Sequence, residues 1–463
     1  MRKIFAILTA LMLVSCSMNH DEVVISTSKS QLSNNLEEQA RKIVLNALNK
    51  IDPATRGSVR TINRIETITY EQLFGSTTRS DSTIFGNINP QRNENNRYEL
   101  PLLQIAIFDN NSGYAVLTPL FDENDRVDAG EDDDAGDSTT NTPIKLIALV
   151  DSGTITSNDI ITYTNNNTIP DNYLSPTDIY DEEDEDFLIG GSEANEFVAS
   201  VISSYLYNKN QNVNEDEDIS EVDSIAENKV GPLLQTKWWQ ELPFNYYIHT
   251  YNAQGAKRPV GCCTTATAQI LTYFKNRSLD TYFNVTTSSW SDLESGAYIL
   301  NSNPTDTTHY NAARIMKVIA DGIGVKYNYS GKGETFATPK RIQQFLENTL
   351  DYNVDRQIDG SKAVRLRRIV SSLNDNKPVI MAALGGLRYG HAWVVDGYMK
   401  NEDSSRSVND YLIHCNFGWA GNNDGWYFIN ILHSDKNDND LLDPNTGEQD
   451  MKFNWLFRYL FFN

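Results

Sequence analysis

The chain has 463 residues, which is more than one ordinary hydrophobic core needs and predicts two or three domains. With 40% hydrophobic and 22% charged residues it can bury a core, which excludes wholesale disorder. Its formal net charge of −23 argues against a surface for nucleic acid or anionic lipid. Residues 1–229 hold 16 basic and 39 acidic side chains, whereas residues 230–463 hold 23 of each. The charge break predicts two differently built parts that meet near residue 229.

The first residues have the pattern of an export signal. Residues 1–3 are basic, residues 4–14 are largely apolar, and Cys16 closes the segment. This resembles a bacterial lipoprotein signal, in which the cysteine is lipidated and becomes the mature N-terminus; the alternative is an ordinary secretory leader. Ser17 after the cysteine favours, by the same resemblance, an outer-membrane lipoprotein that is periplasmic or cell-surface, unless processing releases it. No later segment approaches 18 apolar residues, so we expect no transmembrane helix.

The first half predicts few regular elements, in a polar and acidic background. We expect a polar tether over 17–35, a helix over 36–51, a hairpin over 102–117, a strand over 144–150 and a helix over 192–207. The acidic runs 121–142 and 181–186 are interpreted as solvated loops rather than calcium sites, because they lack the glycine turn and spacing of a calcium loop.

The second half predicts helices first and antiparallel strands afterwards, which is typical of the α+β class. It holds all seven tryptophans of the chain. The expected helices are 264–274, 311–323, 340–350 and 369–373, and the expected strands are 379–383, 391–398, 411–416 and 426–432.

Three cysteines remain beyond the leader, namely Cys262, Cys263 and Cys415. So sparse a set is no disulfide framework, and the absence of CxxC and HExxH patterns makes a zinc site improbable, so we expect no metal and no cofactor. Cys262 stands where a loop turns into a helix, and unpaired N–H groups there stabilise a thiolate. Gly261 before it would let a substrate backbone approach. Two small buried helix residues remain the alternative interpretation.

Two later segments supply partners for a reactive thiol. His391 follows Gly390 and precedes an alternating apolar strand, which places the imidazole at the mouth of a sheet. Asn416 could hold the ring in the tautomer that accepts a thiol proton, and Trp419 could cover that hydrogen bond and exclude water. We interpret His414 and Cys415, next to Asn416, as packing residues.

Together these motifs resemble the streptopain-type cysteine peptidases. The resemblance rests on four motifs in order: residues 237–245, 261–270, 390–397 and 416–425. It implies a papain-like fold made as a zymogen with an N-terminal inhibitory propeptide, and an apolar substrate side chain two positions before the scissile bond. It also implies that the amide of Gln240 helps to bind the oxyanion. Cys263 and Phe417 depart from the family pattern.

The sequence thus predicts a lipoprotein signal over 1–16, an acidic propeptide over 17–229 and a papain-like peptidase domain over 230–463. The expected catalytic residues are Cys262, His391, Asn416 and Gln240, the expected substrate-binding residues are Gly261, Gly390 and Trp419, and the expected lipidation site is Cys16. Partners would be protein or peptide substrates and the propeptide, with membrane contact only through the lipid.

Two other functions remain open at this stage. A transglutaminase-like enzyme or cell-wall amidase would share the cysteine and histidine, with Asp396 orienting the ring. A non-enzymatic surface lipoprotein would bind glycans or host proteins through exposed Trp and Tyr side chains.

Overall fold

The computed structural model describes fourteen segments of the chain. They are residues 20–51, 60–74, 101–119, 144–165, 180–191, 193–209, 228–279, 287–294, 307–327, 335–358, 362–385, 388–400, 411–432 and 455–463. The expected signal with Cys16, and the acidic run 121–142, lie outside the described residues. Among the described residues, no helix has the length and apolar character needed to cross a membrane.

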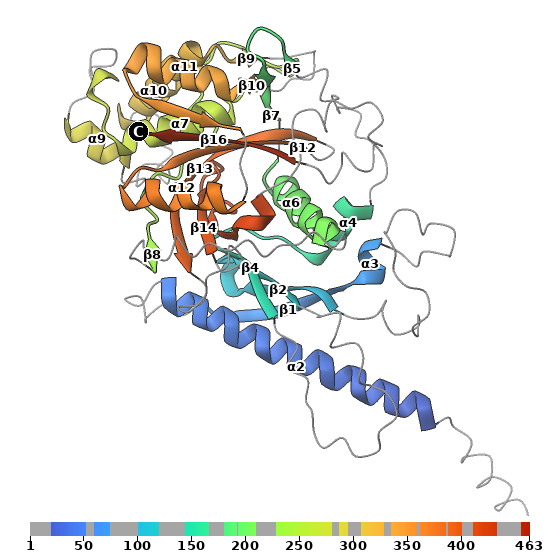
Figure 1. Cartoon of the computed structure of the whole chain (residues 1–463). Helices are drawn as coiled ribbons and strands as arrows, with labels where there is room; N and C mark the ends of the chain where they lie inside the picture. The colour runs from blue at the N-terminus through green and yellow to red at the C-terminus, as the bar shows by residue number, and fades with distance from the viewer. Residues whose placement is uncertain are drawn as a thin grey trace, which may run out of the picture.

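One sheet of eleven strands runs through both halves of the described chain (Figure 1). Its order is β1-β2-β3-β4-β15-β14-β13-β12-β16-β11, with the short β8 pairing β13. The strands are β1 Ile62–Thr69, β2 Pro101–Phe108, β3 Tyr114–Pro119, β4 Ile144–Val150, β8 Lys229–Val230, β11 Val354–Gln357, β12 Val379–Gly385, β13 Arg388–Lys400, β14 Tyr411–Asn416, β15 Gly425–Phe428 and β16 Trp455–Phe462. All neighbours in it are antiparallel.

The two halves of the chain meet edge to edge within this sheet. Strand β15 of the second half pairs with β4 of the first, with Gly425 opposite Val150. A side chain at Gly425 would bring its Cβ within 2.6 Å of the Leu149 carbonyl oxygen, so only glycine allows the strands to approach this closely. The first-half strands therefore continue the sheet of the second half, and the first half is not a loosely tethered unit.

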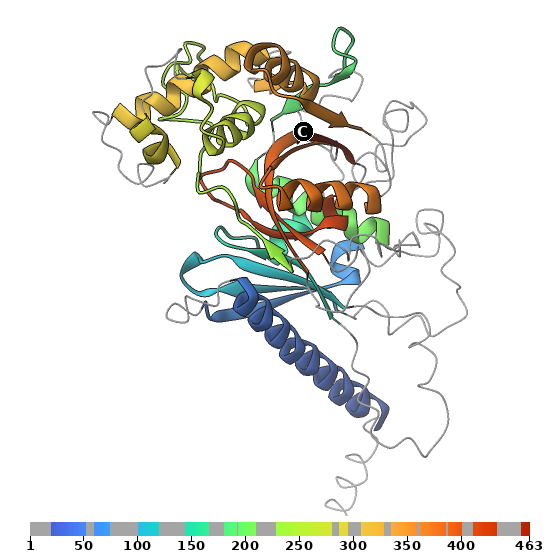
Figure 2. The same cartoon turned by 60° about the vertical axis from the view of Figure 1, so that its left-hand side comes forward.

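Helices cover both faces of the second-half strands (Figures 1 and 2). On one face lie α7 Cys262–Tyr273, α9 Thr287–Glu294, α10 Thr307–Ile323 and α11 Pro339–Leu350; on the other lie α12 Lys362–Asn374 and α6 Ala194–Lys209. Strand β13 alternates between the two cores: Trp393 and Val395 face α12, whereas Ala392 and Val394 face α7. Burial on both faces explains why β12 and β13 are near-continuous apolar runs.

The remaining described elements are short or lie at the edges of the fold. They are α3 Tyr70–Phe74, α4 Ser157–Asn165, the 3-10 helices η2 Asp109–Asn111, η4 Arg277–Leu279 and η8 Ile429–Leu432, the pair β5 Tyr180–Asp181 and β6 Asp186–Phe187, and the three-stranded sheet of β7 Ile189–Gly190, β10 Thr335–Ala337 and β9 Lys326–Tyr327.

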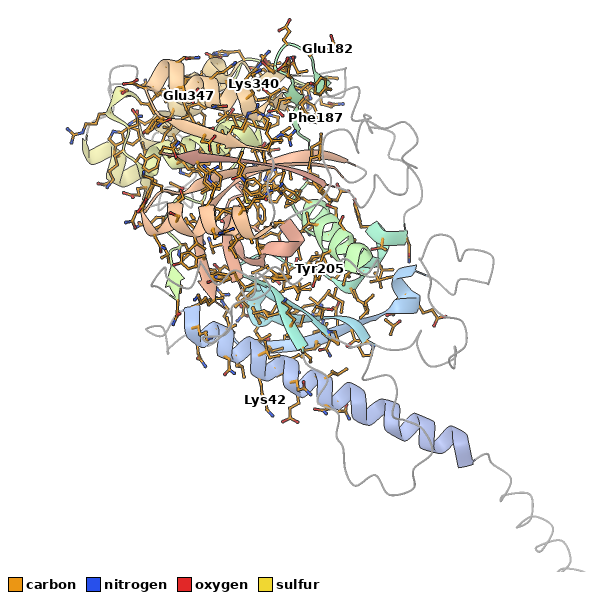
Figure 3. The ribbon with its side chains drawn as sticks, viewed as in Figure 1. Lys42, Glu182, Phe187, Tyr205, Lys340 and Glu347 are labelled. Carbon is orange, nitrogen blue, oxygen red and sulfur yellow. The ribbon has the colours of Figure 1, made fainter. Side chains whose placement is uncertain are left out.

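A long helix, α2 His20–Ile51, lies across the first-half strands (Figure 2). Its buried residues Leu36, Ala40, Val44 and Ala47 recur at helical spacing, and the helix contacts β2 and β4. Lys42 points away from the sheet (Figure 3). The helix expected over 36–51 is confirmed. The expected tether over 17–35 is wrong from His20 onward, because that polar stretch continues the same helix.

Most other predicted elements are confirmed within two or three residues, and the α+β class is confirmed with them. The strand expected over 426–432 ends at Phe428, where η8 begins. Strand β16 was not predicted, although it lies between β12 and β11 in the sheet. Its eight residues are buried on both faces and show no two-residue alternation, so sequence periodicity gives no strand signal.

A buried ion-pair cluster joins the halves beside the β4–β15 junction. His414 Nδ1 lies 2.6 Å from Asp396 Oδ1, and its Nε2 lies 3.5 Å from Asp151 Oδ2 of the first half. Burial disfavours the charged imidazolium and lowers the pKa of His414. The two carboxylates have the larger effect and raise this pKa to about 10. The expectation that His414 is a packing residue is therefore wrong, because its side chain is a charged bridge; Cys415 is fully buried, as expected.

The stability of the full chain should fall as pH rises towards 10. A group whose pKa is raised on folding stabilises the fold fully below its unfolded pKa of about 6.5, and that contribution disappears as pH rises through its folded pKa. We expect denaturant unfolding to show a loss on the order of a few kcal/mol between pH 7 and pH 10.5. The variant His414→Gln should lack this loss, and an equal loss in both proteins would contradict the prediction.

Candidate active site

The first component of the site is the N-terminus of helix α7. Gly261 caps the helix with a backbone φ of +91°, a conformation that other residues adopt only with strain. A Cβ there would also lie 2.9 Å from Thr335 Cγ2. Cys262 is thus the first residue of the helix, among N–H groups that have no partner within the helix, and it is 3% exposed.

The second component is His391 on strand β13. Its Nε2 lies 2.8 Å from the backbone carbonyl oxygen of Phe417. A carbonyl only accepts, so this contact places a proton on Nε2. The neutral ring then has its lone pair on Nδ1, the nitrogen left to accept a proton from Cys262.

The structure brings Cys262 and His391, 129 residues apart in sequence, into one hydrogen-bonded pair. The thiol of Cys263, the imidazole of His391 and the N–H of Ala392 all bond to the Cys262 sulfur. The contact with Cys263 lowers the pKa of Cys262 most. Burial raises this pKa, and the charge of His391 lowers it further. The net result is that the pKa of Cys262 lies well below its ordinary value, as a nucleophilic thiolate requires.

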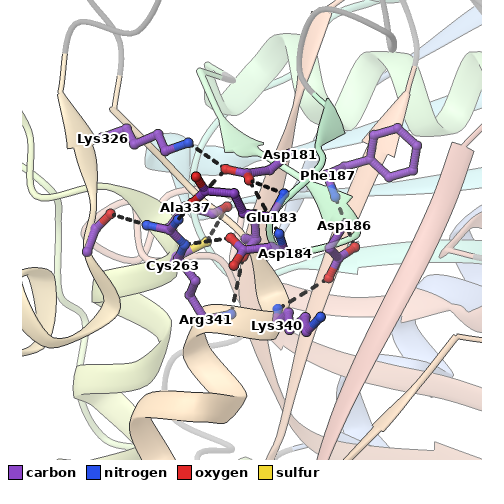
Figure 4. Close-up of polar contacts among 12 residues, drawn as sticks. Asp181, Glu183, Asp184, Asp186, Phe187, Cys263, Lys326, Ala337, Lys340 and Arg341 are labelled. Carbon is purple, nitrogen blue, oxygen red and sulfur yellow. Dashed lines mark hydrogen bonds and ion pairs between the residues drawn. The ribbon is translucent and has the colours of Figure 1, made fainter.

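Cys263 differs from its neighbour in direction and in chemistry. Its Sγ lies 3.8 Å from the carbonyl oxygen of Ala337 on β10, on the inner side of α7 (Figure 4). The bond to the Cys262 thiolate, burial and the charge of Asp186 all raise the pKa of Cys263 well above its ordinary value. The two cysteines are therefore an acidic thiol beside the imidazole and an inert thiol in the core.

Asn416 does not make the contact expected from the sequence. Its Oδ1 accepts from Gln269 Nε2 at 3.0 Å, and its Nδ2 donates to the carbonyl oxygen of Thr236 at 2.7 Å. The amide is thus occupied by α7 and by the segment before it, and the ring of His391 bonds instead to the carbonyl of Phe417. Asn416 acts on the ring only through the backbone that it anchors.

Aromatic side chains enclose His391. Trp419 stacks on the imidazole with ring centroids 4.0 Å apart and planes at 16°, whereas the bond to Asn416 that it was expected to cover is replaced by other contacts of that amide. Phe197 of α6 lies 5.3 Å from the imidazole centroid and also contacts Trp393, Phe417 and Trp419. Phe197 belongs to the first half of the chain, so that half completes the apolar wall around the histidine.

The remaining expected site residues lie close to this pair. The carbonyl oxygen of Gln240 accepts from Val260 N at 2.8 Å, which ties the Gln240 loop to the segment leading into Cys262. Gly390, directly before His391, faces β12: a Cβ there would lie 1.9 Å from the carbonyl oxygen of Ala383. Its small size therefore serves strand packing at the site.

A second segment of the first half, residues 181–190, reaches the same region. Strand β7 pairs with β10 and contacts both α7 and β13, which carry Cys262 and His391. Phe187 and Ile189 are buried in the same core cluster as the two cysteines (Figure 3). This short strand therefore lies beside both components of the site.

Ion pairs hold the acidic part of this segment (Figure 4). Asp181 pairs with Lys326, Asp184 with Arg341, and Asp186 with Arg356 and Arg458. The three aspartates are at most 7% exposed. The expected solvated loop over 181–186 is wrong for these three positions, because they are buried and paired with basic residues. The partners come from distant elements, which the local sequence cannot indicate.

The structure bears on the alternative functions as well. Asp396, the residue expected to orient the ring in an amidase or transglutaminase, bonds to His414 and to the N–H of Leu234. Five of the seven tryptophans are buried, and the exposed aromatic side chains of the described residues include Trp239, Tyr246 and Tyr251. Within the described residues, no group of His, Cys, Asp and Glu side chains has the arrangement of a metal site.

Comparison with known proteins identifies similar proteins, and these are cysteine peptidases. Residues 238–427 match the Peptidase C10 family. Streptopain of Streptococcus pyogenes is 27% identical over 278 residues, which span 53% of this chain and 67% of streptopain. The thiol protease/hemagglutinin PrtT of Porphyromonas gingivalis is 24% identical over 245 residues, which span 44% of this chain and 25% of PrtT.

Among solved structures, prointerpain A of Prevotella intermedia aligns with a TM-score of 0.47 and 19% identity, covering 78% of this chain and 94% of that one. Active interpain A aligns with a TM-score of 0.38 and 22% identity, covering 53% and 97%. The chain is an enzyme of the cysteine peptidase class. Its second half is similar to the streptopain-type peptidases.

Sequence reasoning missed two contributors to the site. The Phe417 carbonyl was missed because a backbone group carries no residue-type signal, although the family pattern around it was visible. Phe197 was missed because its helix looks like any apolar helix, and only the tertiary contact reveals its neighbours.

An irreversible epoxide reagent should label Cys262 alone. Its lowered pKa supplies thiolate at neutral pH, whereas the raised pKa values of Cys263 and Cys415 keep those thiols protonated. Peptide mapping after labelling of the reduced chain measures this, with the His391→Ala variant as control for activation by the ring. An adduct on Cys263 would overturn the assignment.

Proposed function

We propose that the protein is an exported cysteine endopeptidase, made as a zymogen, that hydrolyses protein or peptide substrates. The observation that carries the proposal is the hydrogen-bonded pair of Cys262 and His391 at a helix terminus, in a chain of the cysteine peptidase class. Thiolate catalysis requires a thiol with a lowered pKa and a ring tautomer whose Nδ1 is unprotonated and can accept the thiol proton.

In the proposed mechanism, the Cys262 thiolate attacks the carbonyl carbon of the scissile peptide bond. The resulting oxyanion accepts hydrogen bonds from the backbone N–H of Cys262 and from the side-chain amide of Gln240. The imidazolium of His391 donates its Nδ1 proton to the leaving amine, which gives a thioester. Water then attacks the thioester with the ring as base, and the thiolate is regenerated.

Other residues hold this geometry or the substrate. Asn416 anchors the strand end before Phe417, and Trp419 shields the Nε2 hydrogen bond from water. Gly261 leaves room for the substrate backbone at the helix terminus. By resemblance to the family, an apolar side chain is expected two positions before the scissile bond.

Replacement of the nucleophile should abolish hydrolysis. We expect Cys262→Ala and His391→Ala to lower kcat/KM on a fluorogenic peptide with an apolar residue at that position by about 10⁴-fold or more. The matched control Cys263→Ala removes one hydrogen bond to the thiolate, so a loss of about tenfold or less is expected. Full activity of Cys262→Ala, or cleavage of peptidoglycan fragments in place of peptides, would contradict the proposed function.

The proposed zymogen state rests on what the first half contributes near the site. Phe197 packs against the His391 ring, and β7 lies against α7 and β13, so a substrate meets residues of the first half around both catalytic groups. We propose that residues 17–229 form the propeptide, that residues 230–463 form the mature enzyme, and that cleavage falls within 208–236. Lipidation of Cys16 would hold the precursor at the outer membrane.

One experiment tests both export and maturation. In cells given labelled palmitate, the precursor should carry label that Cys16→Ser abolishes. The purified wild-type chain incubated with reductant should yield an unlabelled product whose N-terminus lies within 208–236. The Cys262→Ala chain should stay intact under the same conditions. An uncleaved 17–463 chain with full activity would contradict the zymogen proposal.

A further inference from the structure

The turn between β14 and β15 carries the carbonyl that bonds to the catalytic ring. Phe417 uses both of its backbone groups: its carbonyl oxygen lies 2.8 Å from His391 Nε2, and its N–H donates to Asp424 Oδ1 at 2.8 Å. A carboxylate seven residues further along the chain is therefore connected to the imidazole through one residue.

Asp424 is buried where it makes this contact, and burial removes its carboxyl group from water. The residue is 3% exposed, and burial raises the pKa of its carboxyl to about 7, against the opposing effect of the Phe417 N–H. Its backbone is also fixed, because its N–H donates to the carbonyl oxygen of Gly421 and its own carbonyl accepts from Asp151 N. Buried carboxyl groups with a perturbed pKa and a specific partner are often found at functional sites, and Asp424 lies in a turn beside the active site.

We infer that Asp424 is a positioning residue for catalysis, which orients the Phe417 carbonyl towards His391 and so fixes the ring and its tautomer. The inference rests on the proposed function, because it assigns a residue to that reaction. Asn416 holds the turn from the other side through its bonds to Gln269 and Gly418. Asp424 touches no reacting atom.

The physical effect of Asp424 is to prevent rotation of the backbone at Phe417. Without an acceptor for its N–H, the residue can turn, and its carbonyl then leaves the plane of the imidazole. The ring would lose the bond that keeps the proton on Nε2. Displacements of about 1 Å in a catalytic group can reduce rates about 10²-fold.

The test compares two nearly isosteric variants of the full-length chain. Asp424→Leu fills the same space without an acceptor, whereas the amide oxygen of Asp424→Asn can still accept from Phe417. Asn422→Ala, at an exposed position of the same turn, is the matched control. Any chain that does not mature alone is processed with tagged wild-type enzyme, which is then removed on resin.

We expect Asp424→Leu to lower kcat about 10²-fold with KM changed less than about threefold, while Asp424→Asn stays within about fivefold of the wild type. The pH profile of Cys262 alkylation by iodoacetamide should shift to higher pH in Asp424→Leu only. If the leucine variant does not fold, Asp424→Ser, whose hydroxyl is too short to reach Phe417, is measured in the same way.

The outcomes separate this inference from the proposed function. A folded leucine or serine variant with wild-type kcat and an unchanged alkylation profile overturns the positioning role. An equal loss in Asp424→Asn and Asp424→Leu also overturns it, because the acceptor alone would then not suffice. An inactive wild-type chain whose Cys262 is not selectively alkylated would instead refute the proposed function.

Discussion

The meeting of a helix terminus and a strand is the contact on which the site depends. Cys262 owes its lowered pKa to hydrogen bonds from Cys263, its neighbour on α7, and from His391 and Ala392, which reach it only because α7 packs against β13. Burial alone would have the opposite effect on the thiol, since it disfavours the charged form. The fold therefore supplies enough directed donors to outweigh the cost of desolvating a thiolate.

The orientation of the ring depends on backbone rather than on a side-chain amide. The Phe417 carbonyl serves as acceptor, and hydrogen bonds restrain the backbone on both sides of it: Asp424 accepts from Phe417 N, and Asn416, itself held by α7, accepts from Gly418 N. Trp419 stacks on the ring. A backbone acceptor has no side-chain torsions of its own, so its direction is set entirely by such restraints.

The acidic character of the first half has a structural use beyond solubility. Asp181, Asp184 and Asp186 pair with basic residues of the second half, and Asp151 shares the charge of His414. Each pair joins segments that are far apart in the sequence. Several pairs are largely removed from water, where an ion pair stabilises the fold only if well-placed hydrogen-bond partners compensate for the lost solvation. Together with the β4–β15 pairing they join the two halves of the chain through specific contacts.

The sequence by itself determined the elements and the reactive residues. Local periodicity located the helices at 264–274 and 311–323 and the strand at 144–150, and residue chemistry in an ordered set of motifs singled out Cys262 and His391. Tertiary structure alone decided which groups surround them. The sheet that continues through both halves, the strand at 455–462, the contact of Phe197 and the Phe417 carbonyl depend on pairing and packing between distant segments. Such contacts leave no local pattern, because burial on two faces removes periodicity and a backbone acceptor is the same in every residue.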